Sequence, residues 1–339
     1  MSFIYGIIRE KTKRRNHMER EKNNRMLEIF FRALRGEKIS LKKLAEEYNV
    51  STKSISRDIN SIQNFLAEHR ELMQNAELTY SHKERTYILN SDEFLKNKEL
   101  FALVKIILGS RALNKEEILT LITKLKKFTT IQDRKTLENL IRKEIYHYHE
   151  VKSDCKSVID NVWKIVQAIE EKRTISITYY KMNRDEVKHK IKPVSVLFSE
   201  YYFYLIAYKA DDMSYKPIYF RIDRISSITE HREKFELEKK YDFDEGNLRE
   251  KNQFMFPGDT VKIRFEFSGL SLQAILDRLP TAKVVEKNGN TSIIEAEVNH
   301  GRGIIMYLLS QGSWVKVLSP QSLADEIKEE LNKMISYYE

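Results

Sequence analysis

The stretch Ile39–Leu66, ISLKKLAEEYNVSTKSISRDINSIQNFL, decides how the first part of the chain folds. Within it, apolar residues of Leu41–Tyr48 recur at i, i+3, i+4 and i+7, which is one face of a helix. Asn49 tolerates the left-handed backbone that a tight turn needs, and Ser51 is a good N-cap for a following helix. The pattern therefore predicts two short helices joined by a tight turn.

The second of these helices has two chemically different faces. Its apolar stripe consists of Ile55, Ile59, Ile62 and Leu66. At about 100° per residue, the opposite side carries cations and small hydrogen-bonding groups. Phosphates bind lysine and arginine, base edges bind arginine, asparagine and serine, and no bulky side chain blocks the approach to a major groove. A small helix, a turn and an N-capped basic helix are the order of a helix-turn-helix.

We therefore expect this second helix to contact double-stranded DNA. Thr52 is expected to contact phosphate near the start of the helix. The residues expected to read or grip the major groove are Lys53, Ser54, Ser56, Arg57 and Asn60. The alternative is an ordinary helical hairpin whose basic face is solvated.

The segments on either side complete a predicted winged helix. Lys22–Arg35 has the apolar spacing of an amphipathic helix that covers the hairpin of helices from behind. Leu78–Tyr80 and Thr86–Leu89 are short alternating runs around a charged tip, which predicts a β-hairpin. As a wing, this hairpin would bring Lys83 and Arg85 to the flanking DNA backbone; otherwise the two cations are simply solvated.

Charge is concentrated in this part of the chain. The 339 residues have a net charge of +9, and residues 1–90 contain 18 lysines and arginines against 12 acidic residues. The excess positive charge, which is what a polyanion would attract, therefore lies with the helix-turn-helix. Lys11–Arg15, KTKRR, is either a flexible arm that touches phosphate or part of an unstructured leader before Met18.

The composition also limits the class of protein. The length suggests two or three domains. A single cysteine, Cys155, rules out an internal disulfide and fits a reducing cytoplasm. No apolar run reaches about 18 residues, so we expect no membrane span. No phosphate-binding glycine loop, carboxylate cluster, metal-ligand spacing or catalytic triad stands out, so we expect neither an enzyme, a cofactor nor a metal site.

The remaining chain changes pattern twice. Residues 92–150 keep helical spacing without proline, which predicts three or four helices that couple domains or form a dimer surface. After one more helix, five short segments rich in Tyr, Ile and Val predict a small antiparallel barrel. These segments are Thr174–Tyr180, Val187–Leu197, Tyr201–Ala210, Pro217–Arg224 and Ile225–Glu230.

Two of these segments resemble a known family. Phe203–Tyr208, FYLIAY, is similar to the Trp-Tyr-Leu tripeptide and flank of the WYL domain, with Phe203 where tryptophan is usual. Phe220–Ile225, FRIDRI, resembles that domain's Phe-Arg-Leu-Asp-Arg-Ile strand, and Lys192–Leu197 resembles its proline-containing strand. Residues 259–339 resemble the C-terminal extension of the same family, and the N-terminal module resembles the DeoR-like winged helix that usually precedes a WYL domain. Read without the resemblance, residues 259–339 show a βαβ-like alternation.

The resemblance implies a regulatory domain that binds a nucleotide-like or single-stranded nucleic-acid effector. Arginine binds phosphate bidentately and bases stack on tyrosine. The residues expected to bind the effector are Tyr180, Lys190, Lys192, Tyr204, Arg221 and Arg224. The alternatives are a structural salt bridge between Arg221 and Asp223 and ordinary packing of the tyrosines.

The sequence thus predicts an α+β multidomain protein with a winged helix, a helical linker, a small Sm/SH3-like barrel and an α+β extension. The expected divisions are residues 1–21 (basic arm), 22–91 (winged helix), 92–155 (helical linker), 156–235 (WYL), 236–258 (linker) and 259–339 (extension). We expect a cytoplasmic, homodimeric transcriptional regulator, because two half-sites are how such modules gain affinity. The alternatives are a nucleic-acid-processing enzyme that docks through its winged helix and a non-specific architectural DNA binder.

Overall fold

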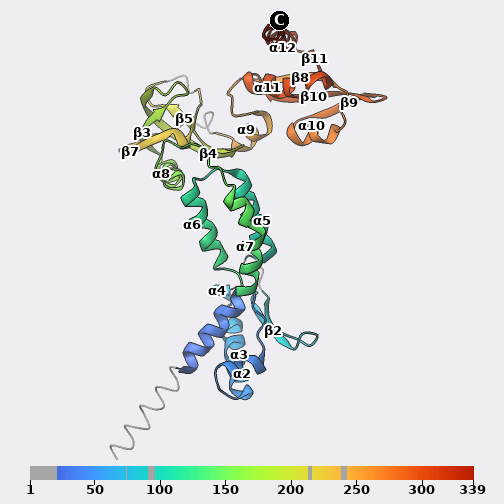
Figure 1. The fold of residues 1–339 in the computed structure, drawn as a ribbon. Coiled ribbons are helices and arrows are strands. Elements are labelled where there is room, and N and C mark those ends of the chain that lie inside the picture. The colour runs from blue at the N-terminus through green and yellow to red at the C-terminus, as the bar shows by residue number, and fades with distance from the viewer. Residues whose placement is uncertain (1–20, 74, 91–94, 96, 213–215, 238–242) are drawn as a thin grey trace, which may run out of the picture. The chain divides into compact units, whose positions relative to one another are not determined.

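A computed structural model describes residues 21–73, 75–90, 95, 97–212, 216–237 and 243–339. The chain forms two compact units, Met1–Gly109 with Lys115–His149 and Ser110–Asn114 with Glu150–Glu339 (Figure 1). The basic segment Lys11–Arg15 lies outside the described residues. Within the described part, no helix combines the length and the apolar character needed to cross a bilayer.

The first unit begins with the two predicted short helices and the turn between them, after a helix at the start of the described chain. Residues 21–34 are helical, and α2 (Leu41–Glu47) and α3 (Thr52–Glu68) follow. Asn49 adopts φ 51° in the turn, and the Ser51 side chain caps α3 by accepting a hydrogen bond from the backbone N–H of Ser54 at 3.1 Å. The predicted apolar stripe of α3 is buried, because all four of its residues lie in one core with Ile29 and Leu44.

The predicted hairpin is also present. Strands β1 (Glu77–Ser81) and β2 (Thr86–Asn90) pair antiparallel, after a short α4 (Arg70–Met73). Ile39 and Tyr87 exchange two backbone hydrogen bonds of 2.8 Å, so the chain before α2 adds a third strand-like contact to the hairpin. This contact attaches the hairpin to the residues just before α2.

A buried ion pair fixes α3 against the helix of residues 21–34. Arg25 Nε lies 2.7 Å from Asp58 Oδ2, and the Asp58 side chain is only 1% exposed. Asp58 precedes Ile59 on the packed side of α3, so this carboxylate sits at the rim of the apolar core. The sequence pattern did not single out this pair.

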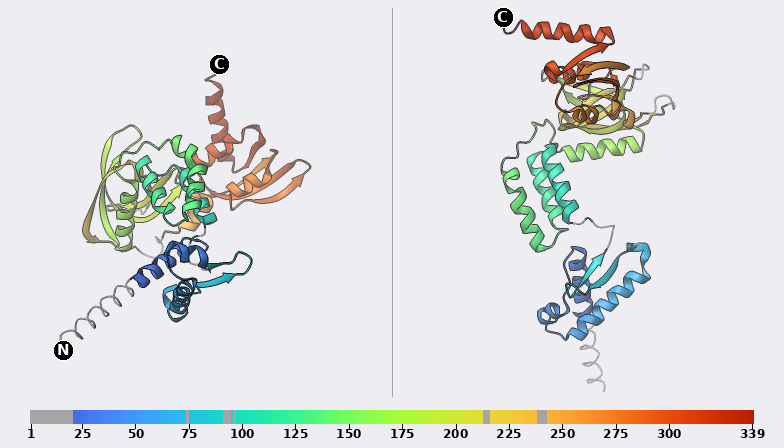
Figure 2. Two further views of the ribbon diagram at one scale, coloured as in Figure 1. Left: turned by 60° about the horizontal axis from the view of Figure 1, so that its bottom comes forward. Right: turned by 90° about the vertical axis from the view of Figure 1, so that its right-hand side faces the viewer.

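Three helices complete the first unit, within the three or four predicted for residues 92–150. They are α5 (Asn97–Ser110), α6 (Lys115–Lys126) and α7 (Ile131–Tyr146), and they lie side by side (Figure 1, Figure 2). Their shared interior contains Leu100, Val104, Ile118, Ile122 and Ile141. Polar contacts link α7 to the other two helices, namely Lys105 to Glu144 from α5, and Lys126 to Glu138 at 2.8 Å from α6.

The second unit opens with α8 (Val158–Glu170) packed on a five-stranded sheet. The strands are β3 (Arg173–Tyr180), β4 (Glu186–Ser199), β5 (Tyr202–Lys209), β6 (Ile218–Arg221) and β7 (Ile225–Lys234). Their order is β6-β5-β4-β3-β7, so β6 and β7 are the two edges. The predicted small Sm/SH3-like barrel is not confirmed, since no pairing of β6 with β7 closes the described sheet.

The sheet is nevertheless strongly curled. Only the 3-10 turn Ile222–Arg224 joins the two edge strands. If the sheet were flat, its two edge strands would lie about 19 Å apart, whereas a three-residue connection spans about 11 Å at most. The edges must therefore approach each other at this end. The same turn corrects the predicted strand Pro217–Arg224, which ends at Arg221.

A β-bulge gives the sheet two packed faces. The register between β4 and β5 shifts between Pro193 and Ser195, which leaves one extra residue, Val194. In a strand without a bulge, the odd-numbered Ile191 and Leu197 would face the same side of the sheet. Here Ile191 faces the core beneath α8, whereas Leu197 faces a second cluster with Leu248 of α9 (Glu245–Lys251). The Ser195 hydroxyl donates to Glu245 Oε1 at 2.5 Å and ties α9 to this second face.

The end of the chain forms a second sheet with helices. The elements are β8 (Thr260–Phe267), α10 (Leu272–Arg278), β9 (Lys283–Asn288), β10 (Thr291–Asn299), α11 (Arg302–Ser310), β11 (Val315–Ser319) and α12 (Gln321–Ile335). The antiparallel order β11-β8-β10-β9 is that of a split βαβ fold. The predicted βαβ-like alternation is thus present, but β9 was missed because all its side chains are exposed and show no alternation.

Candidate functional site

The outer face of α3 is open. Thr52, Lys53, Arg57 and Asn60 are exposed, whereas Ser54 and Ser56 are half-buried. Lys53 and Arg57 have no ion-pair partner among the residues that the structure describes, so their charges are available to a ligand. The Ser54 hydroxyl lies 3.0 Å from the Ser51 hydroxyl, and this engages it in the helix cap. Of the predicted residues, Ser54 is thus the least free to contact another molecule.

The hairpin tip presents two further cations. Lys83 and Arg85 are exposed, and Arg85 adopts φ 54° in the turn. The carboxylate between them, Glu84, is bound by Lys38 at 2.6 Å. The negative charge at the tip is therefore partly neutralised, and the tip remains attractive to an anion.

In the second unit, tyrosines and an arginine come together on adjacent strands. Tyr202 and Tyr204 alternate along β5 and therefore share a face, with ring centroids 6.2 Å apart. Tyr204 pairs across the strands with Arg221 of β6. The Arg221 guanidinium carbon lies 3.3 Å from the ring centroid of Tyr202, which is a close stacking contact. The sequence indicates Tyr202 as a source of an aromatic ring beside Tyr180 and Tyr204, although it is not among the six residues expected to bind the effector.

Arg221 is already bound to a carboxylate. Its Nε and Nη2 donate to Asp223 Oδ1 at 3.2 Å and Oδ2 at 2.6 Å, which is a bidentate arrangement. The side chains are 18% and 7% exposed. Burial opposes the charge of Arg221, but the bonds to Asp223 outweigh it and raise the pKa of the guanidinium. The 3-10 turn makes this i, i+2 contact possible, and the structure thus contains an Arg221–Asp223 ion pair.

Two neighbouring groups are less constrained. Arg224 is half-buried and has no ion-pair partner in the described parts of the chain. Burial raises the pKa of Tyr204 to about 12, although Arg221 and Arg224 act in the opposite direction. The phenol of Tyr204 is therefore a neutral hydrogen-bonding group beside two cations.

The other three predicted residues do not join this group. Tyr180 donates its hydroxyl to Glu186 at 2.8 Å. Lys190 binds Glu233 at 2.5 Å, and Lys192 pairs in register with Tyr208. Both lysines are on β4, two strands from β6. The structure thus brings together Tyr204, Arg221 and Arg224, and leaves the lysines at a distance along the same sheet.

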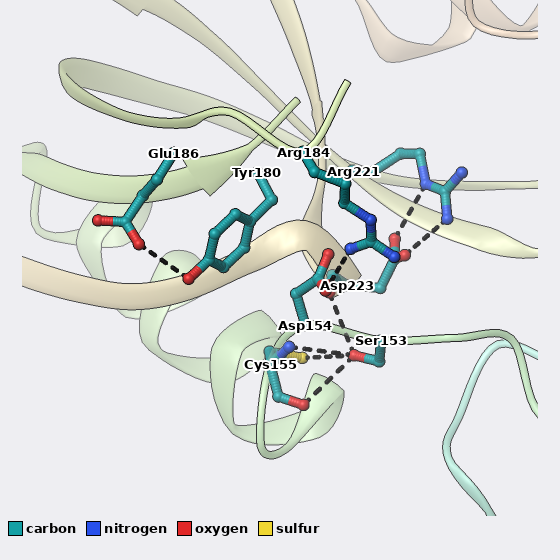
Figure 3. A network of polar contacts seen from close by, with 8 residues as sticks. All are labelled: Ser153, Asp154, Cys155, Tyr180, Arg184, Glu186, Arg221 and Asp223. Carbon is teal, nitrogen blue, oxygen red and sulfur yellow. Dashed lines mark hydrogen bonds and ion pairs between the residues drawn. The ribbon is translucent and has the colours of Figure 1, made fainter. Parts of the chain in front are cut away.

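A segment that the sequence did not single out meets the same turn. The backbone carbonyl of Asp223 accepts hydrogen bonds from the N–H groups of Asp154 at 2.7 Å and Cys155 at 3.2 Å, and from the Ser153 hydroxyl at 3.1 Å (Figure 3). The Asp154 carboxylate is bound in turn by Arg184 Nη1 at 2.6 Å. The segment through which the chain enters the second unit is therefore hydrogen-bonded to Asp223, whose carboxylate binds Arg221.

Comparison with known protein families identifies both parts of the second unit. Residues 160–230 match the WYL domain, and residues 258–335 match the WCX domain. The chain therefore contains a WYL domain followed by a WCX domain, within the boundaries predicted for the WYL segment and one residue earlier for the extension. No match was found among curated proteins.

Several solved structures are distantly similar to this chain, and two of them are a proteasome accessory factor and a CRISPR Cas-related protein. Proteasome accessory factor B/C (PafBC) of Arthrobacter aurescens is 16% identical, with a TM-score of 0.28, over 94% of this chain and 49% of that chain. This chain thus spans about half the length of PafBC. A CRISPR Cas-related protein is 15% identical, with a TM-score of 0.35, over 73% of this chain and 75% of the other.

Proposed function

We propose that this chain is a sequence-specific DNA-binding transcriptional regulator, whose WYL domain senses an anionic nucleotide-like or single-stranded nucleic-acid effector. The observation that carries the proposal is the division of α3 into a buried apolar stripe and an exposed face with Lys53, Arg57 and Asn60. A helix built only for packing has no need of free cations beside an unobstructed polar surface. The WYL domain adds a ligand-sensing module to the same chain.

The proposed DNA contacts follow the geometry of a winged helix. The α3 helix has 17 residues and is about 25 Å long, which is enough to lie along a major groove. Its first turns would present Lys53, Ser56, Arg57 and Asn60 to the bases, with Thr52 on phosphate. Lys83 and Arg85 at the hairpin tip would then meet the flanking backbone.

The proposed effector site is the group of Tyr202, Tyr204, Arg221 and Arg224. Guanidinium groups pair with phosphate, and tyrosine rings accept stacked bases. The two ring centroids lie 6.2 Å apart with the ring planes at 88°, so the rings would contact two differently oriented bases of a short strand. We propose a binding role for this group, because it offers cations and aromatic rings.

We also propose that the regulator acts as a homodimer. Two helix-turn-helix modules bind half-sites about 34 Å apart, one turn of DNA, which multiplies the weak affinity of one module. Sizing chromatography of the protein, with and without its selected DNA, tests this point. A monomer in both conditions would contradict it.

The central test is selection of bound duplexes from a random pool, followed by titration of the selected site. Loss of a bidentate base contact is worth about 1–3 kcal/mol, so Arg57→Ala should weaken binding roughly 5- to 150-fold. Arg142→Ala, which removes an exposed arginine from α7, is the matched control and should bind normally. Equal affinity for all duplexes would instead indicate an architectural DNA binder, and unaltered binding by Arg57→Ala would refute the proposed interface.

A further inference from the structure

We propose that Asp223 is a built-in competitor for the effector, and that its release from Arg221 is the conformational switch of the second unit. This inference rests on the proposed function, because it concerns the regulation of the same site. In the structure, Arg221 donates two hydrogen bonds to the Asp223 carboxylate and stacks on Tyr202. An anion that binds the Nε–Nη2 edge of the Arg221 guanidinium must therefore displace the carboxylate that already occupies this edge.

The exchange gives the site two discrete states. In one, Arg221 holds Asp223; in the other, it holds a phosphate of the effector and the carboxylate is free. The Asp223 side chain is 7% exposed, so a freed carboxylate cannot remain unpaired in place. Desolvation of a lone charge is costly, and the 3-10 turn Ile222–Arg224 must move to bring it to water.

Movement of this turn would directly affect the chain segment that is hydrogen-bonded to it. The Asp223 carbonyl holds the N–H groups of Asp154 and Cys155 and the hydroxyl of Ser153. This segment lies at the point where the chain enters the second unit, which begins again at Glu150. Displacement of Asp223 therefore breaks or rearranges three hydrogen bonds on the connecting segment.

A second series of contacts starts from the Tyr202 ring, on which Arg221 stacks. The Tyr202 ring lies 6.3 Å from the Tyr201 ring, and Arg111 lies over Tyr201 at 5.5 Å. Arg111 belongs to Ser110–Asn114, the loop between α5 and α6 that groups with the second unit. Asn114 of the same loop donates to the backbone carbonyl of Lys156 at 3.5 Å. Both segments by which the helical linker joins the second unit thus contact the neighbourhood of the Arg221–Asp223 pair.

The coupling is tested without any effector. The experiment measures amide hydrogen exchange at Asp154 and Cys155 in the full-length protein. Exchange should be faster in Arg221→Gln and in the isosteric Asp223→Asn than in the wild type. The expected increase is roughly tenfold, which corresponds to a loss of about 1.4 kcal/mol of local stability. Lys262→Gln, which breaks an exposed ion pair with Glu295 in the C-terminal sheet, is the control and should leave these amides unchanged. Unaltered exchange in both folded variants would overturn the coupling.

The competition is tested with a 5′-phosphorylated single-stranded tetranucleotide as the probe. Asp223→Asn should bind it roughly tenfold more tightly than the wild type, because the neutral amide competes less for the guanidinium. Equal or weaker binding by Asp223→Asn would overturn the competition. If neither protein binds the probe, the nucleic-acid effector of the proposed function fails, whereas the exchange experiment still decides the coupling.

Discussion

Removal of Arg25 should destabilise the first unit more than any exposed charge does. Arg25 Nε binds Asp58 Oδ2 at 2.7 Å, and the two side chains are 14% and 1% exposed. The second carboxylate oxygen, Oδ1, is buried without a hydrogen-bond partner in the described structure. Within the described residues, Arg25 is therefore the counter-charge of a buried carboxylate on the packed side of α3.

The expected magnitude follows from this burial. Breaking a buried pair by removal of one partner costs about 3–5 kcal/mol, since the remaining charge is uncompensated. Replacing both members removes that charge, so Arg25→Ala combined with Asp58→Ala should be more stable than Arg25→Ala alone. Lys38→Ala, which breaks the exposed Lys38–Glu84 pair, is the control and should cost less than about 1 kcal/mol.

The chain offers a convenient way to assign the effect to one unit. Its two tryptophans, Trp163 and Trp314, both belong to the second unit. In urea unfolding, Arg25→Ala should shift the circular dichroism transition of the helical first unit and leave the tryptophan fluorescence transition in place. If Arg25→Ala lowers the free energy of unfolding by less than about 1 kcal/mol, or if the double variant is less stable than Arg25→Ala, the ion pair does not make the proposed contribution to stability.

Three further variants test other features. A Cβ at Gly303 would lie 1.9 Å from the Gln253 carbonyl oxygen, so Gly303→Ala should lower the melting temperature of the second unit, as tryptophan fluorescence would report. Ser51→Ala removes the α3 N-cap and should cost about 1 kcal/mol in urea unfolding, and an unchanged midpoint would contradict this role for the cap. The pKa of Tyr204 is raised to about 12, above its ordinary value near 10, so its stabilising contribution is complete below about pH 10 and is lost towards pH 12. The urea midpoint of Tyr204→Phe should therefore fall less over that pH range than the wild-type midpoint, and an identical fall would refute the buried phenol.

Local patterns in the sequence predicted the elements well. Ser51 as a cap, Asn49 in a left-handed turn and the buried stripe of α3 depend on neighbours within a few residues, so the sequence contains the whole signal. The hairpin and the five strands of the WYL segment were predicted for the same reason. The extra strand β9 escaped because Val284 and Val285 are adjacent and exposed, which gives no alternation.

Features that depend on distant contacts could not be read from the sequence. The predicted small barrel is not confirmed, because a barrel depends on whether the distant strands β6 and β7 pair, and the 3-10 turn at Ile222–Arg224 ends β6 early. The Arg25–Asp58 pair joins residues 33 apart, and the anchor of Ser153 on Asp223 joins residues 70 apart. In the candidate site, Arg221, Arg224 and Tyr204 were predicted and do converge, whereas the role of the Asp223 backbone appears only in the fold.

The β-bulge in β4 has a consequence for the evolution of strand length. Pro193 lacks an N–H group, and a proline inside a sheet is tolerated beside such an irregularity. Val194 is the extra residue, so its deletion would restore strict alternation and keep Ile191 and Leu197 on their present faces. An insertion elsewhere in β4 would instead move the side chains that follow it to the opposite face of the sheet. Natural length variation in this strand should therefore be confined to Val194, while every other position is free to change only its side chain.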